Sequence, residues 1–260
     1  MPEAGPSTRF RGTALTVLAA GGVFLTAVVI TAGSLGLLPK SSSVESVVPP
    51  PVSDPTTTDS YGASGILPET TSLSASLLAS ITAPRAGADA AAGIPEGALQ
   101  IPPPALAAYK RAEAVLVARE PGCGVSWTLL AGLGRVVSDH ADSSLDARGN
   151  TTRPILGPEL NGSAGLAEIP DTDHGKLDGD KVWDRAVGPM QIIPSVWQRV
   201  GADSDGDGTA NPHNIFDAAL GAGRYLCEGG VNLRQGPEQA RAVFRYQRSE
   251  VFVRAVIGWT

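Results

Sequence analysis

The stretch Ser126-Trp-Thr-Leu-Leu-Ala-Gly-Leu-Gly-Arg-Val-Val-Ser-Asp-His140 decides the fold of this chain. Ser126 is of a residue type that favours the N-cap of a helix. Apolar residues then recur at the spacing of one helix face, which predicts a core helix over residues 126–140: Trp127, Leu130, Leu133 and Val137. Gly132 and Gly134 each lower helix stability by roughly 1 kcal/mol, so their presence indicates a close approach by another part of the chain.

The sequence around this stretch predicts a mainly helical domain over residues 104–260. Upstream, residues 105–119 carry apolar side chains at helical spacing, and Pro121-Gly122 ends that helix. Downstream, further helices are expected at residues 194–200, 217–227, 237–246 and 249–259. Residues 142–184 form a long Gly- and Asp-rich loop, and a loop of this length in a compact domain is usually functional. The alternative for this range is a merely solvated acidic loop.

The N-terminal part of the sequence predicts a membrane anchor. Residues 13–38 contain no charge, and at ~1.5 Å per residue a helix of that length exceeds the ~30 Å hydrocarbon core. Arg9 and Arg11 precede it, so we expect a cytoplasmic tail at residues 1–12 and a single-pass signal-anchor at residues 13–38. The alternative is a cleaved signal peptide and a secreted protein, although the apolar region of such peptides is usually only ~7–15 residues. Either interpretation places the folded domain outside the cytoplasm.

Residues 39–103 have the composition of a linker. They are rich in Ser, Thr, Pro and Ala, carry little charge and show no sustained hydrophobic period. We predict a disordered spacer for most of this range, with residues 73–81 compatible with a short helix.

A second stretch, read together with the core helix, makes the sequence pattern more specific: Val187-Gly-Pro-Met-Gln-Ile-Ile-Pro-Ser-Val-Trp197. Together the two stretches resemble the active-site region of secreted bacterial lytic murein transglycosylases of the B type, whose helix pattern is Leu-Ala-Gly-x-Gly-Arg-x-Glu-Ser-x-His. The resemblance covers about residues 109–259 and implies a lysozyme-like α+β fold. It also implies a substrate, the glycan strands of peptidoglycan. The implied reaction is non-hydrolytic cleavage of the β-1,4 bond between N-acetylmuramic acid and N-acetylglucosamine, which gives a 1,6-anhydro product.

Val137 stands where the family pattern has its one catalytic glutamate. In the family that residue protonates the leaving oxygen and then acts as the base. Valine can neither donate nor accept a proton, so we predict weak or absent turnover. The alternative is an active enzyme with a displaced acid, for which the candidates are His140, Glu159 and Asp180. His140 is three residues further on and shares the helix face, but the family pattern already contains it.

The resemblance places substrate-contacting groups at Ser138, Met190, Gln191 and Tyr246. For Met190 and Tyr246 the alternative is plain core packing. Three other positions depart from the usual residues of the family: Ile192 for Phe, Gln247 for Asn and Phe252 for Tyr. Together with Val137, these changes indicate that selection for catalysis is relaxed. Two stretches of the long loop match the family's groove wall: residues 157–162 and 171–180.

The stretch Asp203-Ser-Asp-Gly-Asp-Gly-Thr209 predicts a structural calcium site, because alternating aspartates and a carbonyl oxygen are ligands that Ca²⁺ prefers. A standard loop would carry a bidentate Glu at the position of Asn214, whereas the family's longer loop uses an aspartate that matches Asp217. The predicted ligands are therefore Asp203, Asp205, Asp207, Thr209 and Asp217. The alternative is an acidic turn in which Asp217 is an N-cap.

The two cysteines of the chain, Cys123 and Cys227, match cysteines of the family, which implies a disulfide in an oxidising compartment. Two buried free thiols are the alternative. A net charge of −6 and the lack of a long basic run argue against a nucleic-acid partner.

Three classes of function follow from these features. A non-catalytic protein that binds peptidoglycan glycan strands, or scaffolds a partner in the cell wall, agrees best with Val137. An active lytic transglycosylase with an acid supplied elsewhere agrees with the extent of the family pattern. A calcium-stabilised structural domain without glycan affinity is the third class. In the anchored form, residues 13–38 attach the protein to the bacterial cell membrane.

Overall fold

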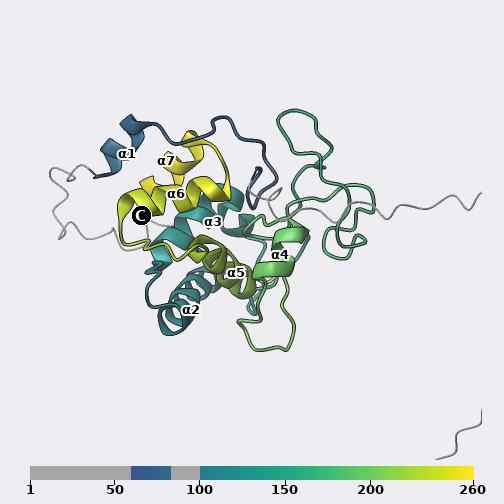
Figure 1. Cartoon of the computed structure of the whole chain (residues 1–260). Helices are drawn as coiled ribbons and strands as arrows, with labels where there is room; N and C mark the ends of the chain where they lie inside the picture. Colours follow the sequence, from purple (N-terminus) through teal and green to yellow (C-terminus); the bar gives the residue numbers. More distant parts are fainter. Residues whose placement is uncertain (1–59, 83–99) are drawn as a thin grey trace, which may run out of the picture. The chain divides into compact units, whose positions relative to one another are not determined.

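The computed structural model describes residues 60–82 and 100–260 (Figure 1). The predicted cytoplasmic tail, the predicted anchor at residues 13–38 and much of the predicted linker lie outside the described residues. The chain divides into two units, residues 1–48 and 49–260, and every described residue belongs to the second unit. Within the described ranges, no helix combines the length and the hydrophobicity that a membrane span needs.

Over these ranges the chain forms helices but no sheet. The helices are α1 (Ala75–Thr82), α2 (Pro103–Arg119), α3 (Trp127–Asp142), α4 (Pro194–Val200), α5 (Ile215–Cys227), α6 (Gly236–Tyr246) and α7 (Glu250–Gly258). The described extended segments pair only through isolated β-bridges. The prediction of a mainly helical domain is confirmed, whereas the β part of the expected fold amounts to these bridges.

The helix α3 begins and packs as the core stretch predicts. Ser126 is its N-cap, since the Ser126 hydroxyl accepts a hydrogen bond of 3.2 Å from a backbone N–H in the first turn. A methyl group at Gly134 would overlap the Tyr109 hydroxyl on α2. A methyl group at Gly132 would lie 2.7 Å from the Val256 carbonyl oxygen on α7. The two glycines therefore allow α2 and α7 to approach α3 closely, as the sequence indicates.

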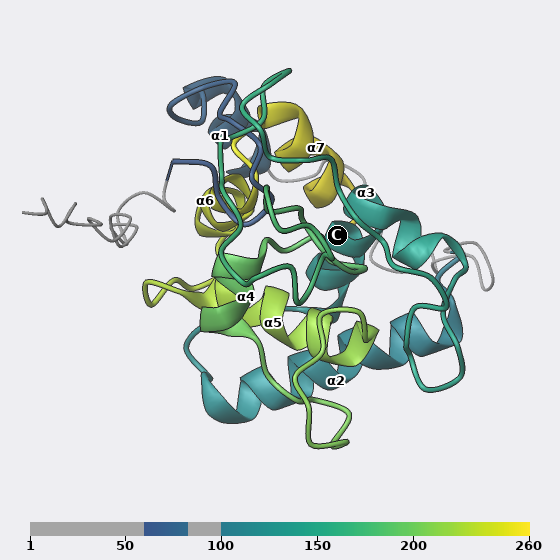
Figure 2. The ribbon, with the colours of Figure 1, turned by 90° about the vertical axis from the view of Figure 1, so that its right-hand side faces the viewer.

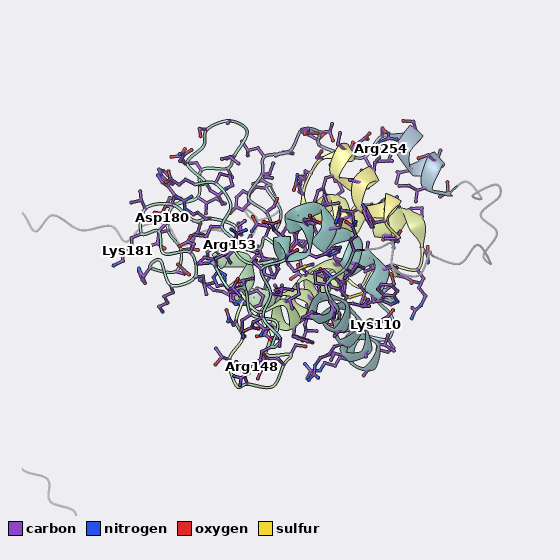
Figure 3. The ribbon with its side chains drawn as sticks, turned by 180° about the vertical axis from the view of Figure 1, so that it is seen from behind. Lys110, Arg148, Arg153, Asp180, Lys181 and Arg254 are labelled. Atoms are coloured by element: carbon purple, nitrogen blue, oxygen red, sulfur yellow. A yellow bond between two sulfur atoms is a disulfide. The ribbon has the colours of Figure 1, made fainter. Side chains whose placement is uncertain are left out.

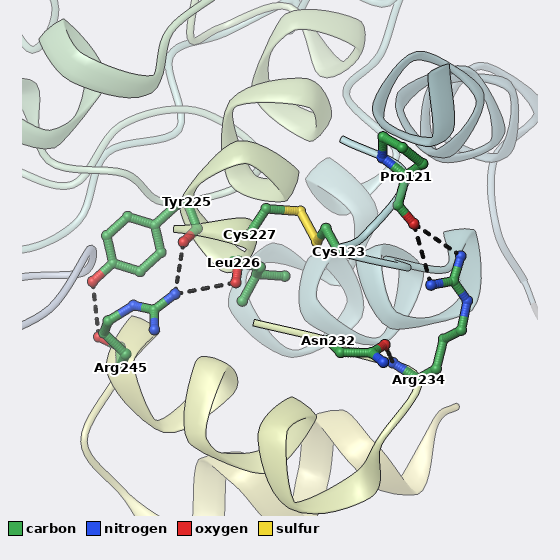
Figure 4. Close-up of a disulfide and its surroundings, with 8 residues drawn as sticks. All are labelled: Pro121, Cys123, Tyr225, Leu226, Cys227, Asn232, Arg234 and Arg245. Carbon is green, nitrogen blue, oxygen red and sulfur yellow. Dashed lines mark hydrogen bonds between the residues drawn. A yellow bond between two sulfur atoms is a disulfide. The ribbon is translucent and has the colours of Figure 1, made fainter. Parts of the chain in front are cut away.

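The helix α5 is buried along most of its length and contacts α2, α3, α4 and α6. The predicted disulfide is confirmed: it joins Cys123, before α3, to Cys227 at the end of α5, with the two Cα atoms 5.4 Å apart (Figure 4). Nearby, the Arg245 guanidinium donates to the backbone carbonyls of Tyr225 and Leu226 at 2.9 and 3.1 Å. A helix end leaves such carbonyls without an intrahelical partner. The end of α5 is thus held by a covalent bond and by a cationic side chain.

Residues 60–82, which we assigned to the linker, belong to the folded domain. Ala63 is fully buried, and its backbone N–H donates to the Tyr246 carbonyl oxygen at 2.9 Å. The short helix considered at residues 73–81 is α1, and it packs on α6 with Leu77 buried (Figure 1). The predicted domain start near residue 104 is therefore wrong for this segment. Backbone hydrogen bonds and the buried Leu77 hold the segment on the domain, although its Ser, Thr and Pro residues resemble a spacer.

The long loop predicted at residues 142–184 lies between α3 and α4 and gathers on one side of the helices (Figure 2). Isolated bridges join its parts, Asn161 to Glu168 and Pro170 to Trp183, and a further bridge joins Leu156 to Val187 in the turn before α4. Side chains from residues 158–166 line a pocket together with Val137 of α3. The loop therefore provides one wall of the region that the sequence singled out.

Candidate functional site

A pocket of about 270 Å³ surrounds Val137. The end of α3 contributes Val136 and Val137, and the segment before α1 contributes Ser64 and Ile66. The long loop, the turn before α4 and the α6–α7 region contribute the remaining lining residues: Pro158, Leu160, Leu166, Ala186, Gln191, Gln247 and Phe252. Val137 therefore lines the same cavity as three other residues that the sequence singled out: the predicted contact residue Gln191, and Gln247 and Phe252, which depart from the family's usual residues.

The side chains that line this pocket are uncharged. Ser64, Gln191 and Gln247 are polar, and the other lining residues are hydrophobic. The Gln191 side-chain amide donates to the Gly188 carbonyl oxygen at 2.9 Å, which holds the side chain in place. The described residues that line the pocket include no Asp, Glu, His, Lys or Arg. The pocket can therefore accept a neutral ligand, but it has no group suited to transfer a proton to it.

His140 does not line the pocket, and the expectation that it shares a helix face with Val137 is wrong. The backbone has positive φ angles of 51° at Asp139, 55° at His140 and 74° at Ala141. This left-handed turn interrupts the helix, and the fully buried His140 places its Nδ1 atom 3.1 Å from the Tyr109 hydroxyl. Burial lowers the pKa of His140 to about 4, so its ring is neutral near pH 7.

The loop carboxylates considered as replacement acids are engaged elsewhere. Glu159 and Asp180 pair with the Arg185 guanidinium at 2.6 and 3.2 Å. Neither carboxylate lines the pocket around Val137. Figure 3 shows Asp180 among the long loops, away from the helices. None of the displaced acids proposed from the sequence therefore belongs to the pocket.

Three of the four predicted substrate-contacting residues have structural contacts instead. Met190 and Tyr246 are fully buried, and the Tyr246 hydroxyl donates to the Met190 carbonyl oxygen at 2.6 Å. The Ser138 hydroxyl donates to the Pro189 carbonyl oxygen at 2.6 Å. These bonds connect α3 and α6 to the turn before α4. The core-packing alternative describes Met190 and Tyr246, and Gln191 is the predicted contact residue that lines the pocket.

The acidic loop before α5 forms a compact carboxylate cluster. Asp203, Asp205 and Asp217 each offer an oxygen within 4.8 Å of the others. The fully buried Asp217 carboxylate accepts from the backbone N–H groups of Ser204 and Asn211 at 2.6 and 2.9 Å. Burial raises the pKa of Asp217, because it disfavours the charged form. Hard divalent cations prefer oxygen ligands, so this cluster can hold such an ion.

One predicted ligand, Asp207, lies outside this cluster. Its carboxylate accepts from the Thr209 backbone N–H at 2.8 Å. The N-cap of α5 is Asn214, whose side chain accepts from the Phe216 backbone N–H at 2.8 Å. The alternative in which Asp217 is an N-cap is therefore wrong.

A second acidic cluster comprises Asp171, Asp173 and Asp184, which the sequence analysis did not group together. Asp184 is fully buried and accepts from the Thr172 hydroxyl at 2.6 Å. Burial raises the pKa of Asp184 to about 6. Asp184 lies outside the Asp-rich run at residues 171–180, so the spacing of that run did not reveal it.

Comparisons with known proteins found no match: no family model, no curated protein and no solved structure matches the chain. The structure itself describes the general features of the domain. The described residues form a mainly helical domain with a disulfide, an uncharged pocket around Val137 and two acidic clusters.

Proposed function

We propose that this is a lysozyme-like domain of the lytic transglycosylase type that binds peptidoglycan glycan strands at the Val137 pocket without cleaving them. The observation that carries the proposal is the lining of that pocket. Val137, Gln191, Gln247 and Phe252 meet there, and no ionisable side chain is among the described lining residues.

The chemistry of the pocket agrees with an uncharged sugar as ligand. Ligand sites are mostly apolar with a few placed polar groups, and this pocket combines hydrophobic walls with the side-chain amides of Gln191 and Gln247. A buried charge without a partner would be costly here, which favours a neutral N-acetylated ring over a charged group. The pocket volume of about 270 Å³ is just below the ~300–1,000 Å³ range of ligand sites, so it suits one ring of a longer strand.

The lack of an acid argues against turnover. A positioned acid or base typically accelerates a reaction by about 10²–10⁴-fold, and the family's reaction uses the same group twice. His140 is buried against Tyr109, and the two loop candidates, Glu159 and Asp180, pair with Arg185. No observation favours an active enzyme with a displaced acid.

We further propose that the Asp203, Asp205 and Asp217 cluster binds calcium as a structural ion. Three carboxylates this close repel one another, and a cation with a preference for oxygen ligands relieves that repulsion. The anchor predicted at residues 13–38 would place this domain on the outer side of the bacterial cell membrane, where peptidoglycan and calcium are both accessible.

Co-sedimentation of the protein with purified peptidoglycan tests the binding claim. We expect wild-type protein to sediment with the glycan and Gln247→Leu, which removes an amide that lines the pocket, to bind roughly 3- to 10-fold more weakly. Gln198→Leu is the matched control, because Gln198 is exposed on α4 and does not line the pocket. Equal binding by all three proteins would place any glycan contact elsewhere, and absence of wild-type binding would refute the proposal.

A further inference from the structure

We propose that residues 60–69 are a permanent wall of the Val137 pocket and that Ile66 in this wall determines which ligand the pocket admits. The proposal rests on the proposed function, because it concerns the same pocket. It assigns a role in ligand recognition to a segment that precedes the main helical part of the domain by sequence.

Backbone hydrogen bonds hold this wall on both sides of the pocket. On the side of the long loop, the Ala167 N–H donates to the Gly65 carbonyl oxygen and the Leu67 N–H donates to the Gly165 carbonyl oxygen, each at 2.9 Å. On the side of α6, the Glu69 N–H donates to the Arg248 carbonyl oxygen at 3.0 Å. The bonds of Ala63 to Tyr246 and Ile193, each 2.9 Å, fix the start of the segment. A segment bonded in this way is part of the fold and not a cover that opens.

The path of the wall depends on two glycines. Gly62 and Gly65 have φ angles of 69° and 73°, which residues with a side chain rarely adopt. A methyl group at Gly62 would also overlap the carbonyl oxygens of Arg245 and Tyr246. A methyl group at Gly65 would lie 2.5 Å from a methyl carbon of Leu160, which itself lines the pocket. The sequence therefore specifies a close fit between this segment and the pocket.

Ile66 is the hydrophobic side chain that the wall presents to the pocket. It is partly exposed, lines the cavity and forms an antiparallel bridge with Leu166 on the long loop. Ser64 also lines the cavity, but its hydroxyl oxygen is buried and has no hydrogen-bond partner among the described residues. The wall therefore offers a hydrocarbon surface, Ile66 beside Leu166, and the ligand feature that it recognises is the apolar face of an uncharged ring.

The neighbouring residue provides a matched control. Leu67 is 41% exposed and does not line the pocket, although it belongs to the same segment and has the same number of side-chain carbons as Ile66. A bulky substitution at residue 66 should fill the cavity, whereas the same substitution at residue 67 should extend into solvent.

The test is glycan binding by the full chain with Ile66→Trp and Leu67→Trp, with the melting temperature of each variant recorded. We expect Ile66→Trp to weaken co-sedimentation with purified peptidoglycan by about tenfold or more, and Leu67→Trp to bind as wild type does. Ile66→Ala is the second variant in case the Trp side chain disturbs folding. It should weaken binding roughly three- to tenfold through loss of hydrocarbon contact.

The outcomes separate the two proposals. Wild-type binding by folded Ile66→Trp and Ile66→Ala proteins would overturn the role of Ile66 and leave the proposed function intact. Equal loss of binding in Ile66→Trp and Leu67→Trp would overturn the selective role of Ile66. Failure of the wild-type protein to bind would refute the proposed function, and the inference about Ile66 with it.

Discussion

Val137 lies near the end of the regular part of α3, two residues before the backbone enters its left-handed turn at Asp139. A carboxyl group at this position would be close to the negative end of a helix dipole and inside an apolar pocket. Both effects raise a carboxyl pKa, which is the property that a general acid needs near neutral pH. The surroundings of residue 137 thus suit an acid, although the residue itself is hydrophobic.

His140 gives a pH-dependent prediction at the same scale. Its folded-state pKa of about 4 lies below the ordinary value of 6.5, so the unfolded chain binds more protons between these values and stability falls as pH falls. We expect this residue to remove about 2 kcal/mol of stability between pH 7 and pH 5. Asp184 has the opposite effect on stability. Its folded-state pKa is raised to about 6, so the folded chain binds more protons than the unfolded chain, and a fall in pH stabilises the fold.

The measurement is therefore a difference between two proteins. Urea unfolding of wild type and His140→Gln at pH 7 and pH 5 should show that the variant loses about 2 kcal/mol less than the wild type over this interval. The contribution of Asp184 is common to both proteins and cancels. Parallel stability curves for the two proteins would contradict the assignment of a neutral, buried His140.

Some single-residue features follow from the sequence and others do not. The N-cap at Ser126 and the close approaches at Gly132 and Gly134 were predictable, because each depends on local chemistry. The position of His140 was not, since residues 139–143 adopt positive φ without a single glycine. Tertiary packing, here the contact of His140 with Tyr109, overrides the local preference.

At the scale of elements, the helices were predicted within a few residues, but the segment at residues 60–82 was assigned to the wrong part of the molecule. Periodic apolar residues identify α2, α3 and α5 from local sequence. The upstream segment is held mainly by backbone hydrogen bonds and by glycines that fit against Leu160 and Tyr246. Such contacts produce no hydrophobic periodicity in the sequence. The composition of the segment therefore indicated a spacer.

A truncation tests the contribution of this segment to stability. We expect a chain that begins at residue 100 to be less stable than one that begins at residue 60 by about 3 kcal/mol or more. The loss has two sources: the buried Leu77 is removed, and the buried backbone groups of Ile193 and Ala167 lose their partners. Chemical denaturation of the two chains is the measurement. Equal free energies of unfolding would show that the segment does not contribute to the stability of the domain.

The acidic cluster before α5 gives a prediction about metal binding. Calcium should stabilise the protein by roughly 2–3 kcal/mol at a concentration about 100-fold above its dissociation constant, and a chelator should reverse the effect. Asp217→Asn should abolish the response, because Asp217 is the buried member of the cluster. Asp146→Asn is the control, since Asp146 accepts backbone N–H groups in an exposed turn outside both clusters. If calcium does not change the melting temperature, the loop is an acidic turn that binds no calcium.

At the scale of the whole described domain, the pocket is assembled from parts of the chain that lie far apart in sequence. The pocket is lined by Ser64 and Ile66, by the end of α3, by the long loop and by the α6–α7 region. The family pattern predicted the helix with Val137 and the turn with Gln191, whereas the contribution of Ile66 needed the three-dimensional arrangement. The Cys123–Cys227 disulfide closes a loop across a sequence separation of 104, and in the chain-entropy model this stabilises the domain by up to about 4–5 kcal/mol.

The central claim is the proposal that this pocket belongs to a lytic transglycosylase-like domain in which Val137 replaces the acid. Analysis of the muropeptides released from purified peptidoglycan by wild type, Val137→Glu and Val136→Glu tests it most directly. Val136→Glu is the matched control, because it introduces the same carboxyl group on the neighbouring residue of the same pocket. We expect no 1,6-anhydro-muropeptides from wild type or Val136→Glu, and release by Val137→Glu at about 10²-fold above the wild-type background. Anhydro-muropeptide release by the wild-type protein, or no more release by Val137→Glu than by Val136→Glu, would contradict the claim.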